Sequence, residues 1–301
     1  MKVRRRGLVD ARELEAMVAE DPLDESRWDV LEDFLVDRGD PRAGIVAAQQ
    51  TGDSIELAKA YDRIAGELLG PQFRKLRKHQ GLGDWRAGYC RRIELAGLRH
   101  ALDDVMGLPA MPLVRTVEVE PAPPAPEPGW LTVALMPITY DHELRALRRL
   151  EVTFPGMITH RPLGRLRLRE LSCALALGVD LEPCDALAGL EYLAFAPEEP
   201  RALSRAAELP ALRDVVLGWT AACPLDPEAL APVLALPLGR LAIRNVPRAQ
   251  VASLMTAIAG APIAKSLRVL ELTGAGPRVT VQHAALAHLE AIVVDAESAS
   301  V

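Results

Sequence analysis

Apolar residues recur from about residue 90 onward in a fixed short signature, apolar-x-x-apolar-x-apolar. The middle apolar residues of successive copies are separated by 24, 33, 16, 27, 22, 26, 29 and 22 residues. Alternate residues of a strand point to opposite faces, so each copy predicts a short strand that buries one face. The nine copies are Cys90/Ile93/Leu95, Val114/Val117/Val119, Leu147/Leu150/Val152, Leu163/Leu166/Leu168, Leu190/Leu193/Phe195, Leu212/Val215/Leu217, Leu238/Leu241/Ile243, Leu267/Leu270/Leu272 and Leu289/Ile292/Val294.

This repeat resembles the leucine-rich repeat, whose period is about 20 to 29 residues. The resemblance implies an α/β fold over residues 86–301: an irregular leucine-rich-repeat solenoid with parallel strands on its concave face. The asparagine that usually follows the strand is missing, with Asn245 as the only nearby candidate. The 16-residue step between Leu150 and Leu166 leaves no room for a full helix and predicts a loop.

A proline-rich segment at about residues 121–129 interrupts the array. Such a run forms neither a helix nor an inner strand, so we expect an extended surface insertion. Two roles are compatible with the sequence of this segment: a linker, or a docking peptide that a proline-binding partner recognises.

Residues 10–80 carry helical rather than strand patterns. Apolar residues lie three and four positions apart, and each run is bounded by a capping residue, a glycine or a proline. The pattern predicts four helices. The expected N-caps include Asp10, Asp40 and Asp53, and the expected ends include Pro22, Gly39 and Gly70.

Two segments of this region point to a known family. The segment from Leu31 to Arg42, LEDFLVDRGDPR, is followed by a tryptophan and a glycine-aromatic step in Trp85 to Ile93. Together they resemble the bacterial repeat-companion domain, a helical module that precedes repeat arrays. The resemblance implies an N-terminal helical cap domain at residues 1–85, which acts as an adaptor or cap and has no active site.

Composition sets further limits. Half of the residues are hydrophobic and 25% are charged, which excludes disorder throughout. The net charge of −6 gives no overall attraction for nucleic acid. No apolar leader follows the basic start and no long apolar stretch occurs, so we expect neither secretion nor membrane insertion. The four dispersed cysteines fit reduced thiols in a cytoplasmic protein.

Motifs that carry chemistry are missing. The chain has no phosphate-binding loop, no nucleophile elbow and no zinc-protease motif. Gly81-Leu82-Gly83 is interpreted as a turn, and Asp141-His142-Glu143 as a helix start. The six histidines are dispersed. We therefore expect a protein that is not an enzyme and that has no catalytic residue, cofactor or metal ligand.

The strand residues between the buried apolar positions would line the concave face. Aromatic and arginine side chains dominate protein interfaces, so this face predicts a protein–protein interaction scaffold whose arginines anchor acidic groups of a partner. The chain's own loops are the alternative cover for its apolar part. The candidate partner-binding residues are Arg149, Glu151, Arg165, Arg167, Arg169, Tyr192, Asp214, Val216 and Arg240.

A nucleic-acid-associated role is the alternative function. It would use a basic helix at residues 74–79 together with the arginine-rich strand, and its affinity would fall steeply with salt. The sequence identifies neither the partner nor the oligomeric state. The candidate nucleic-acid patch is Arg74, Lys75, Arg77 and Lys78.

Overall fold

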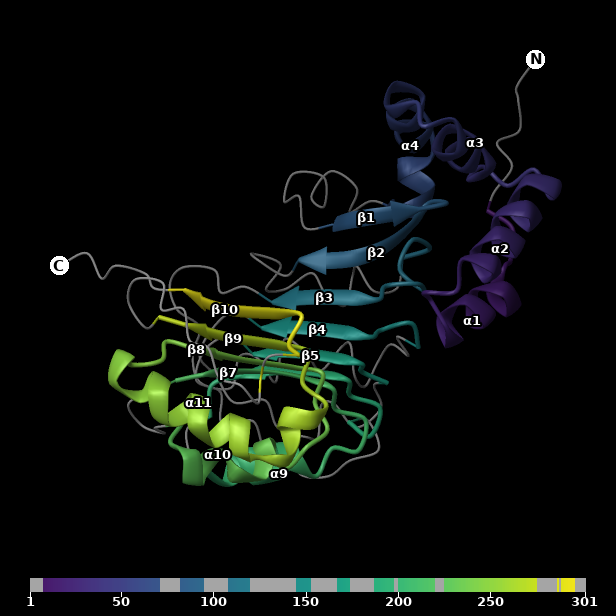
Figure 1. Ribbon diagram of the computed structural model, residues 1–301. Helices are drawn as coiled ribbons and strands as arrows, with labels where there is room; N and C mark the ends of the chain where they lie inside the picture. The colour runs from purple at the N-terminus through teal and green to yellow at the C-terminus, as the bar shows by residue number, and fades with distance from the viewer. Residues whose placement is uncertain are drawn as a thin grey trace, which may run out of the picture. The chain divides into compact units, whose positions relative to one another are not determined.

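The chain has a mixed α/β fold whose strands are mostly parallel (Figure 1). The computed structural model describes residues 8–70, 82–94, 108–119, 145–152, 167–173, 187–197, 200–219, 225–274, 286 and 288–295. These residues divide between two compact units. The N-terminal unit runs from the first helices to Leu150, and the C-terminal unit contains Glu151, Val152 and the described residues from Leu168 onward.

The four helices expected near the N-terminus are present: α1 (Arg12–Glu20), α2 (Glu25–Asp37), α3 (Ala43–Thr51) and α4 (Ser54–Leu68). Asp53 caps α4 as predicted, because its carboxylate accepts the backbone N–H groups of Ile55 and Glu56 at 2.9 and 3.0 Å. The other two expected N-caps lie before the observed helix starts, because α1 starts after Ala11 and α3 starts after Arg42. Asp10 and Asp40 still accept the backbone N–H groups of Arg12 and Arg42, at 3.2 and 2.8 Å, in the turns that precede these helices.

A hairpin follows the helices. Strands β1 (Leu82–Arg86) and β2 (Tyr89–Glu94) are antiparallel, with Trp85 opposite Cys90. The turn interpretation of Gly81-Leu82-Gly83 is therefore wrong for Leu82 and Gly83, because pairing with β2 overrides the local glycine signal. Gly81 lies outside the described residues.

The turn of this hairpin requires glycine at Gly88. Its φ is +82°, and an added Cβ would lie 2.8 Å from Cγ of Arg42. Ala87 also has a positive φ, as expected for the two central residues of a tight hairpin turn. Strand β2 then pairs in parallel with β3 (Thr116–Val119), which aligns Ile93 with Val117.

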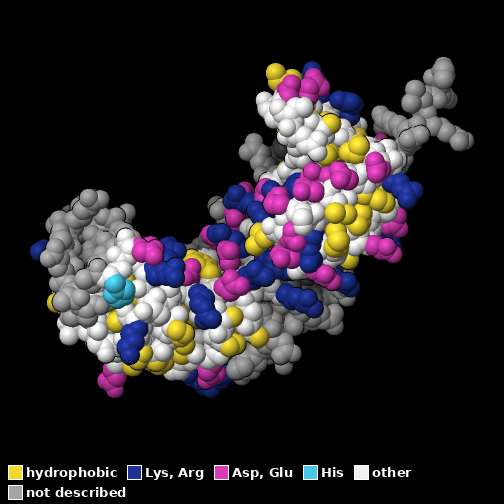
Figure 2. Space-filling model, turned by 45° about the vertical axis from the view of Figure 1, so that its right-hand side comes forward, with side chains coloured by type: hydrophobic (Ala, Val, Ile, Leu, Met, Phe, Trp, Pro, Cys, Tyr) yellow, Lys and Arg dark blue, Asp and Glu magenta, His cyan; other side chains and the backbone are white. Residues whose placement is uncertain are grey.

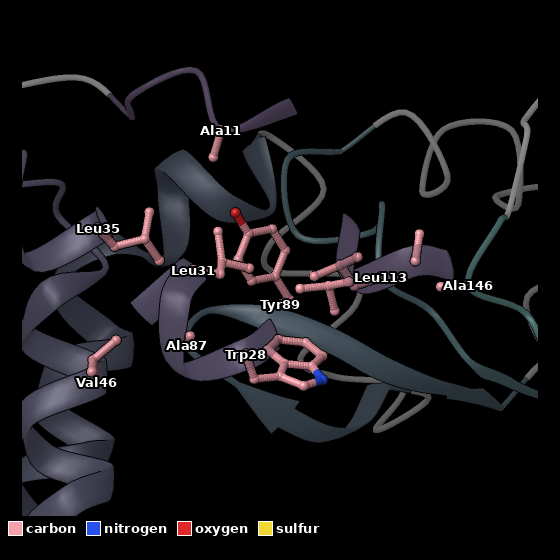
Figure 3. Packing of buried hydrophobic residues seen from close by; sticks show 11 residues of the cluster. Ala11, Trp28, Leu31, Leu35, Val46, Ala87, Tyr89, Leu113 and Ala146 are labelled. Atoms are coloured by element: carbon pink, nitrogen blue, oxygen red, sulfur yellow. The ribbon is translucent and has the colours of Figure 1, made fainter. Parts of the chain in front are cut away.

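The helices and strands of the N-terminal unit share one hydrophobic core (Figure 3). The Trp28 and Tyr89 rings meet edge to face with centroids 6.3 Å apart. The predicted boundary between residues 85 and 86 falls within β1, and core residues lie on both sides of it. The buried members are Ala11, Val18, Ala19, Trp28, Leu31, Leu35, Val46, Ala87, Tyr89, Leu113 and Ala146.

Strand β4 (Arg149–Val152) lies at the division between the units. The C-terminal unit continues with β5 (Glu170–Cys173), β6 (Tyr192–Phe195), β7 (Asp214–Gly218), β8 (Arg240–Arg244), β9 (Val269–Thr273) and β10 (Ala291–Asp295). From β5 to β10 each strand pairs in parallel with the next one along the chain. The middle apolar residues align in register in the order Leu171, Leu193, Val215, Leu241, Leu270 and Ile292.

Helices of the C-terminal unit lie on one side of these strands (Figure 1). They are α9 (Pro200–Ala207), α10 (Pro227–Leu234) and α11 (Val251–Gly260), with the 3₁₀ helices η3 (Arg248–Gln250) and η4 (Pro262–Lys265). Leu203, Leu230 and Leu254 are buried, as are the aligned residues of β5 to β9. Burial of both sets indicates that the signature residues and the helices form one core.

The strand β5 differs in frame from the predicted copy Leu163/Leu166/Leu168. Leu163 and Leu166 lie outside the described residues, but Leu168 precedes the strand, which begins at Glu170, and the buried signature residues are Leu168, Leu171 and Cys173. The spacings of 16 and 27 residues become 21 and 22. The other eight copies coincide with strands β2 to β4 and β6 to β10. The expected loop before Leu166 and the insertion at residues 121–129 lie outside the described residues.

In the part of the chain that the structure describes, no helix combines the length and the apolar character needed to cross a lipid bilayer.

Candidate functional site

The sheet of the C-terminal unit presents two aligned rows of side chains opposite its buried face. We call them together the C-terminal sheet face. Register places Glu170, Tyr192, Asp214, Arg240 and Val269 in the first row. The second row is Ser172, Ala194, Val216, Ala242 and Glu271.

Charged groups of this face are partly buried and interact across strands. The Arg240 guanidinium donates to Oε1 of Glu271 from Nη2 at 2.9 Å and from Nε at 3.2 Å. Burial raises the pKa of Asp214; nearby Arg240 opposes this rise, and Glu191 adds to it. The attraction of Arg240 therefore offsets only part of the free-energy cost of burying the charged Asp214 carboxylate.

The apolar part of the face is a small cluster. Ala194, Val216 and Ala242 are buried, and Tyr192 packs against them. Val216 is only 3% exposed, so its expected role as an accessible partner contact is wrong. The small neighbours on the adjacent strands and the Tyr192 ring form a closely packed floor. Tyr192, Asp214 and Arg240 remain partly exposed.

Two of the candidate arginines, Arg167 and Arg169, do not lie on the strand where the sequence predicts them. Arg167 and Arg169 are exposed, and both precede β5 instead of lying on it. The Arg169 carbonyl accepts the backbone N–H groups of Glu191 and Tyr192, which places Arg169 in the row before the strands. The shifted frame puts Glu170 and Ser172 on the face in place of the arginines. Arg165 lies outside the described residues.

The remaining candidates on β4 are positioned on the strand as expected. Arg149 is exposed and Glu151 is partly buried. In the N-terminal unit the equivalent strand positions carry an ion-paired set, because Arg92 lies 3.0 Å from Glu94 and 2.5 Å from Glu118.

Sequence reasoning missed a buried polar cluster in the N-terminal unit. The guanidinium of Arg42 donates to both carboxylate oxygens of Asp40 at 2.9 Å and also to the Tyr89 hydroxyl. The Tyr89 hydroxyl in turn donates to Glu15 at 2.9 Å. Arg42 lies in the first segment that resembles the repeat-companion domain, and Tyr89 lies in the second. The joint presence of the two segments was the one sequence feature that could have predicted their contact.

The pKa values in this cluster follow from burial and pairing. Burial acts to raise the pKa of Asp40, but hydrogen bonds from Arg42 and from the Val9 backbone hold it below its ordinary value. Burial raises the pKa of Glu15 despite its hydrogen bond from Tyr89. These groups pair with one another inside the core, so the arrangement stabilises the fold.

A second ionic cluster joins the hairpin to α2. Arg86 pairs with Glu32 at 2.7 Å and with Asp29 at 3.4 Å, and it also contacts Glu25. Its guanidinium lies 4.9 Å from the centroid of the Trp28 ring. Acidic and basic side chains accordingly intermix on the surface of the helical region (Figure 2).

Within the described residues, no group of three or more His, Cys, Asp or Glu side chains is arranged to hold a metal ion. The candidate nucleic-acid patch Arg74, Lys75, Arg77 and Lys78 lies outside those residues. No protein-family model matches the chain, and no curated protein matches it.

Proposed function

We propose that this chain is a non-enzymatic protein-binding scaffold that captures a protein partner on the C-terminal sheet face. The observation that carries this proposal is the aligned face itself. Its alternate strand residues are fully buried, whereas Tyr192, Asp214 and Arg240 stay partly exposed in register on adjacent strands. A sheet whose second face served only stability would not need this set of aromatic and charged groups.

We also propose that the array is a leucine-rich-repeat-like solenoid and that the helical region resembling the repeat-companion domain is its N-terminal cap. Eight predicted strand signatures coincide with strands, which supports the repeat. The shared core of helices and hairpin supports the cap, because it covers the first strands with a folded element. A preformed surface of this kind loses little conformational entropy on binding.

Capture from an extract of the source cells tests the proposal. The full chain is immobilised beside a Tyr192→Ala variant and a Glu228→Gln control, because Glu228 is exposed on helix α10. We expect a stoichiometric protein that the wild-type chain and the Glu228→Gln control retain and that Tyr192→Ala loses at least tenfold. Equal capture by all three chains would show that the face is not the binding surface.

Salt separates the protein partner from nucleic acid. A protein interface centred on Tyr192 survives a moderate rise in salt, whereas nucleic acid held through phosphate contacts dissociates steeply. Recovery of only salt-sensitive nucleic acid would contradict the proposed scaffold.

A further inference from the structure

One exposed side of helix α2 is acidic along its whole length. Glu25, Asp29, Asp33 and Asp37 follow one another at intervals of four residues, so they lie along the same side of the helix. We call these four residues the α2 acidic row. Like charges at this spacing destabilise a helix. Arg86 compensates the first half of the row, because it pairs with Glu25 and Asp29.

No described residue compensates the second half of the α2 acidic row. Asp33 and Asp37 are exposed, and neither forms an ion pair within the described part of the chain. The next basic residue of the helix, Arg38, stacks instead on the Phe34 ring, with its guanidinium carbon 5.5 Å from the ring centroid. This half of the row therefore presents two carboxylates that only a group from elsewhere can neutralise.

Half-exposed valines lie beside these carboxylates. Val30 and Val36 are three residues to either side of Asp33, and they are 50% and 49% exposed. Residues three apart are neighbours on the surface of a helix. A guanidinium can pair with Asp33 while the alkyl stem of the same side chain packs on a valine. The surface therefore suits an arginine-rich segment.

The chain carries such a segment directly before its first described residues. Residues 1–7 contain Lys2, Arg4, Arg5 and Arg6 and no acidic residue. Residues 10–40, in contrast, contain twelve acidic residues and three basic ones. The segment itself lies outside the described residues. Its charge is nevertheless complementary to that of the α2 acidic row.

The point at which this segment joins the described chain lies beside the end of α2. The backbone N–H of Val9 donates to Oδ2 of Asp40 at 2.7 Å, and Asp40 follows Asp37 by three residues. The arginines lie three to five residues before Val9, which gives them an extended reach of about 10 to 17 Å. Asp33 and Asp37 are about 6 Å apart along the helix. The segment is therefore long enough, and its covalent connection raises its effective concentration at the row.

We propose that the basic segment at residues 1–7 docks on the α2 acidic row, with its arginines paired to Asp33 and Asp37. The docked segment compensates the second half of the row as Arg86 compensates the first half. This contact is independent of the C-terminal sheet face. A basic partner would reach the row only by displacing the segment.

Trypsin cleavage within residues 1–7, followed by mass spectrometry, tests the inference. Asp33→Asn/Asp37→Asn should accelerate this cleavage about threefold or more over the wild-type chain at low salt. The control Glu208→Gln/Glu228→Gln removes the same charge from exposed positions of the C-terminal unit and should be cleaved at the wild-type rate. High salt should remove the difference between the chains, and circular dichroism verifies that all three are folded.

Cross-linking locates the docked segment. Arg5→Lys introduces a primary amine, which a carbodiimide should couple to Asp33 or Asp37 in the full chain. Mixing isotopically labelled and unlabelled chains separates coupling within one chain from coupling between two copies. Equal cleavage of the three chains, no coupling to the α2 acidic row, or coupling only between copies would each overturn the inference.

Discussion

The N-terminal unit buries charge, whereas the described core of the C-terminal unit is aliphatic. Among the described residues, the buried charged side chains are Glu32, Asp40, Arg42 and Arg148, and all four belong to the N-terminal unit. Arg148 donates to the carbonyls of Ala19 and Glu20 at 2.8 and 2.7 Å and so holds the end of α1. The described core of the C-terminal unit consists instead mainly of Leu, Val, Ile and Ala residues, with Cys173, Phe195 and Met255 among them.

The two units therefore specify their structures by different interactions. Repeated apolar side chains stabilise neighbouring strands by burying apolar surface area, and they can be replaced by other apolar side chains of similar volume. Buried ion pairs demand particular partners, so they define which helix meets which strand, and losing one member leaves an uncompensated charge. The comparison predicts that the N-terminal unit is sensitive to single polar changes and the C-terminal unit to loss of apolar volume.

Loss of the Arg42 guanidinium should have the largest effect. Arg42→Met leaves the Asp40 carboxylate buried without its main donor, so we expect the free energy of unfolding of the N-terminal unit to fall by about 3 to 5 kcal/mol. Urea unfolding monitored by tryptophan fluorescence measures it. Arg38→Met is the matched control, because Arg38 is exposed and should cost less than about 1 kcal/mol. A similar small loss for both variants would contradict the account.

Apolar truncation should have a comparable effect in the C-terminal unit. Leu193 is fully buried in the aligned row, so Leu193→Ala should lower the free energy of unfolding by about 2 to 5 kcal/mol. The measurement is hydrogen exchange of the C-terminal strands. Leu193→Met, which nearly conserves volume, should cost less than about 1.5 kcal/mol. Equal losses for the two variants would show that side-chain volume is not what this row provides.

A backbone change at the hairpin should have a smaller effect. Gly88→Ala introduces a Cβ 2.8 Å from Cγ of Arg42 at a positive φ, so we expect a loss of about 1 to 3 kcal/mol in thermal or urea unfolding. Gly66→Ala is the control, because its added Cβ meets nothing within 4 Å in helix α4 and should stabilise the unit by up to about 1 kcal/mol. A neutral Gly88→Ala would refute the close approach of Arg42.

Acidification should act on the N-terminal unit through Asp40. Its pKa is lowered in the folded state, so its contribution to stability is complete above the ordinary aspartate pKa of about 4 and is lost as the pH falls through the folded value. The stability difference between the wild-type chain and Asp40→Asn should therefore shrink between about pH 5 and pH 2. A difference that stays constant over this range in urea unfolding would exclude the ion pair as its source.

The smallest effect is expected at Asp214, where the sign is opposite. Its pKa is raised, so the folded state favours the neutral form and ionisation opposes folding above the folded pKa. Asp214→Asn should keep or slightly raise the Tm at neutral pH in differential scanning calorimetry. A fall of several degrees would mean that attraction to Arg240 outweighs the cost of burial.

The repeat could be predicted from the sequence because its signal is local and recurs. Eight of the nine signatures coincide with strands, with the middle residues of neighbours aligned. The ninth failed because Leu168 ends one apparent signature and begins another, so periodicity alone cannot choose the frame. Pairing of Leu171 with Leu193 decides it, and that pairing is a tertiary contact. This frame error also affected the candidate site, because it placed Arg167 and Arg169 on the sheet face where the structure has Glu170 and Ser172.

The polar contacts of the N-terminal unit could not be predicted in the same way. Arg42 and Tyr89 are 47 residues apart in the sequence, and Arg148 lies 129 residues from Ala19. No periodicity connects such pairs. Asp40 followed by Pro41 satisfies the local rule for a helix start, and Oδ1 of Asp40 does accept the backbone N–H of Arg42 at 2.8 Å. What the local rule does not predict is that the same carboxylate also binds the buried Arg42 guanidinium and the backbone N–H of Val9, 31 residues away.

Carboxyl footprinting shows whether the C-terminal sheet face is covered when the partner binds. The full chain is labelled with a water-soluble carbodiimide and an amine, alone and with the purified captured partner, and mass spectrometry follows each carboxylate. The account predicts that labelling of Glu170 and Asp214 slows at least severalfold in the complex while labelling of Glu228 on α10 is unchanged. Protection of Glu228 with unchanged labelling of Glu170 and Asp214 would contradict it.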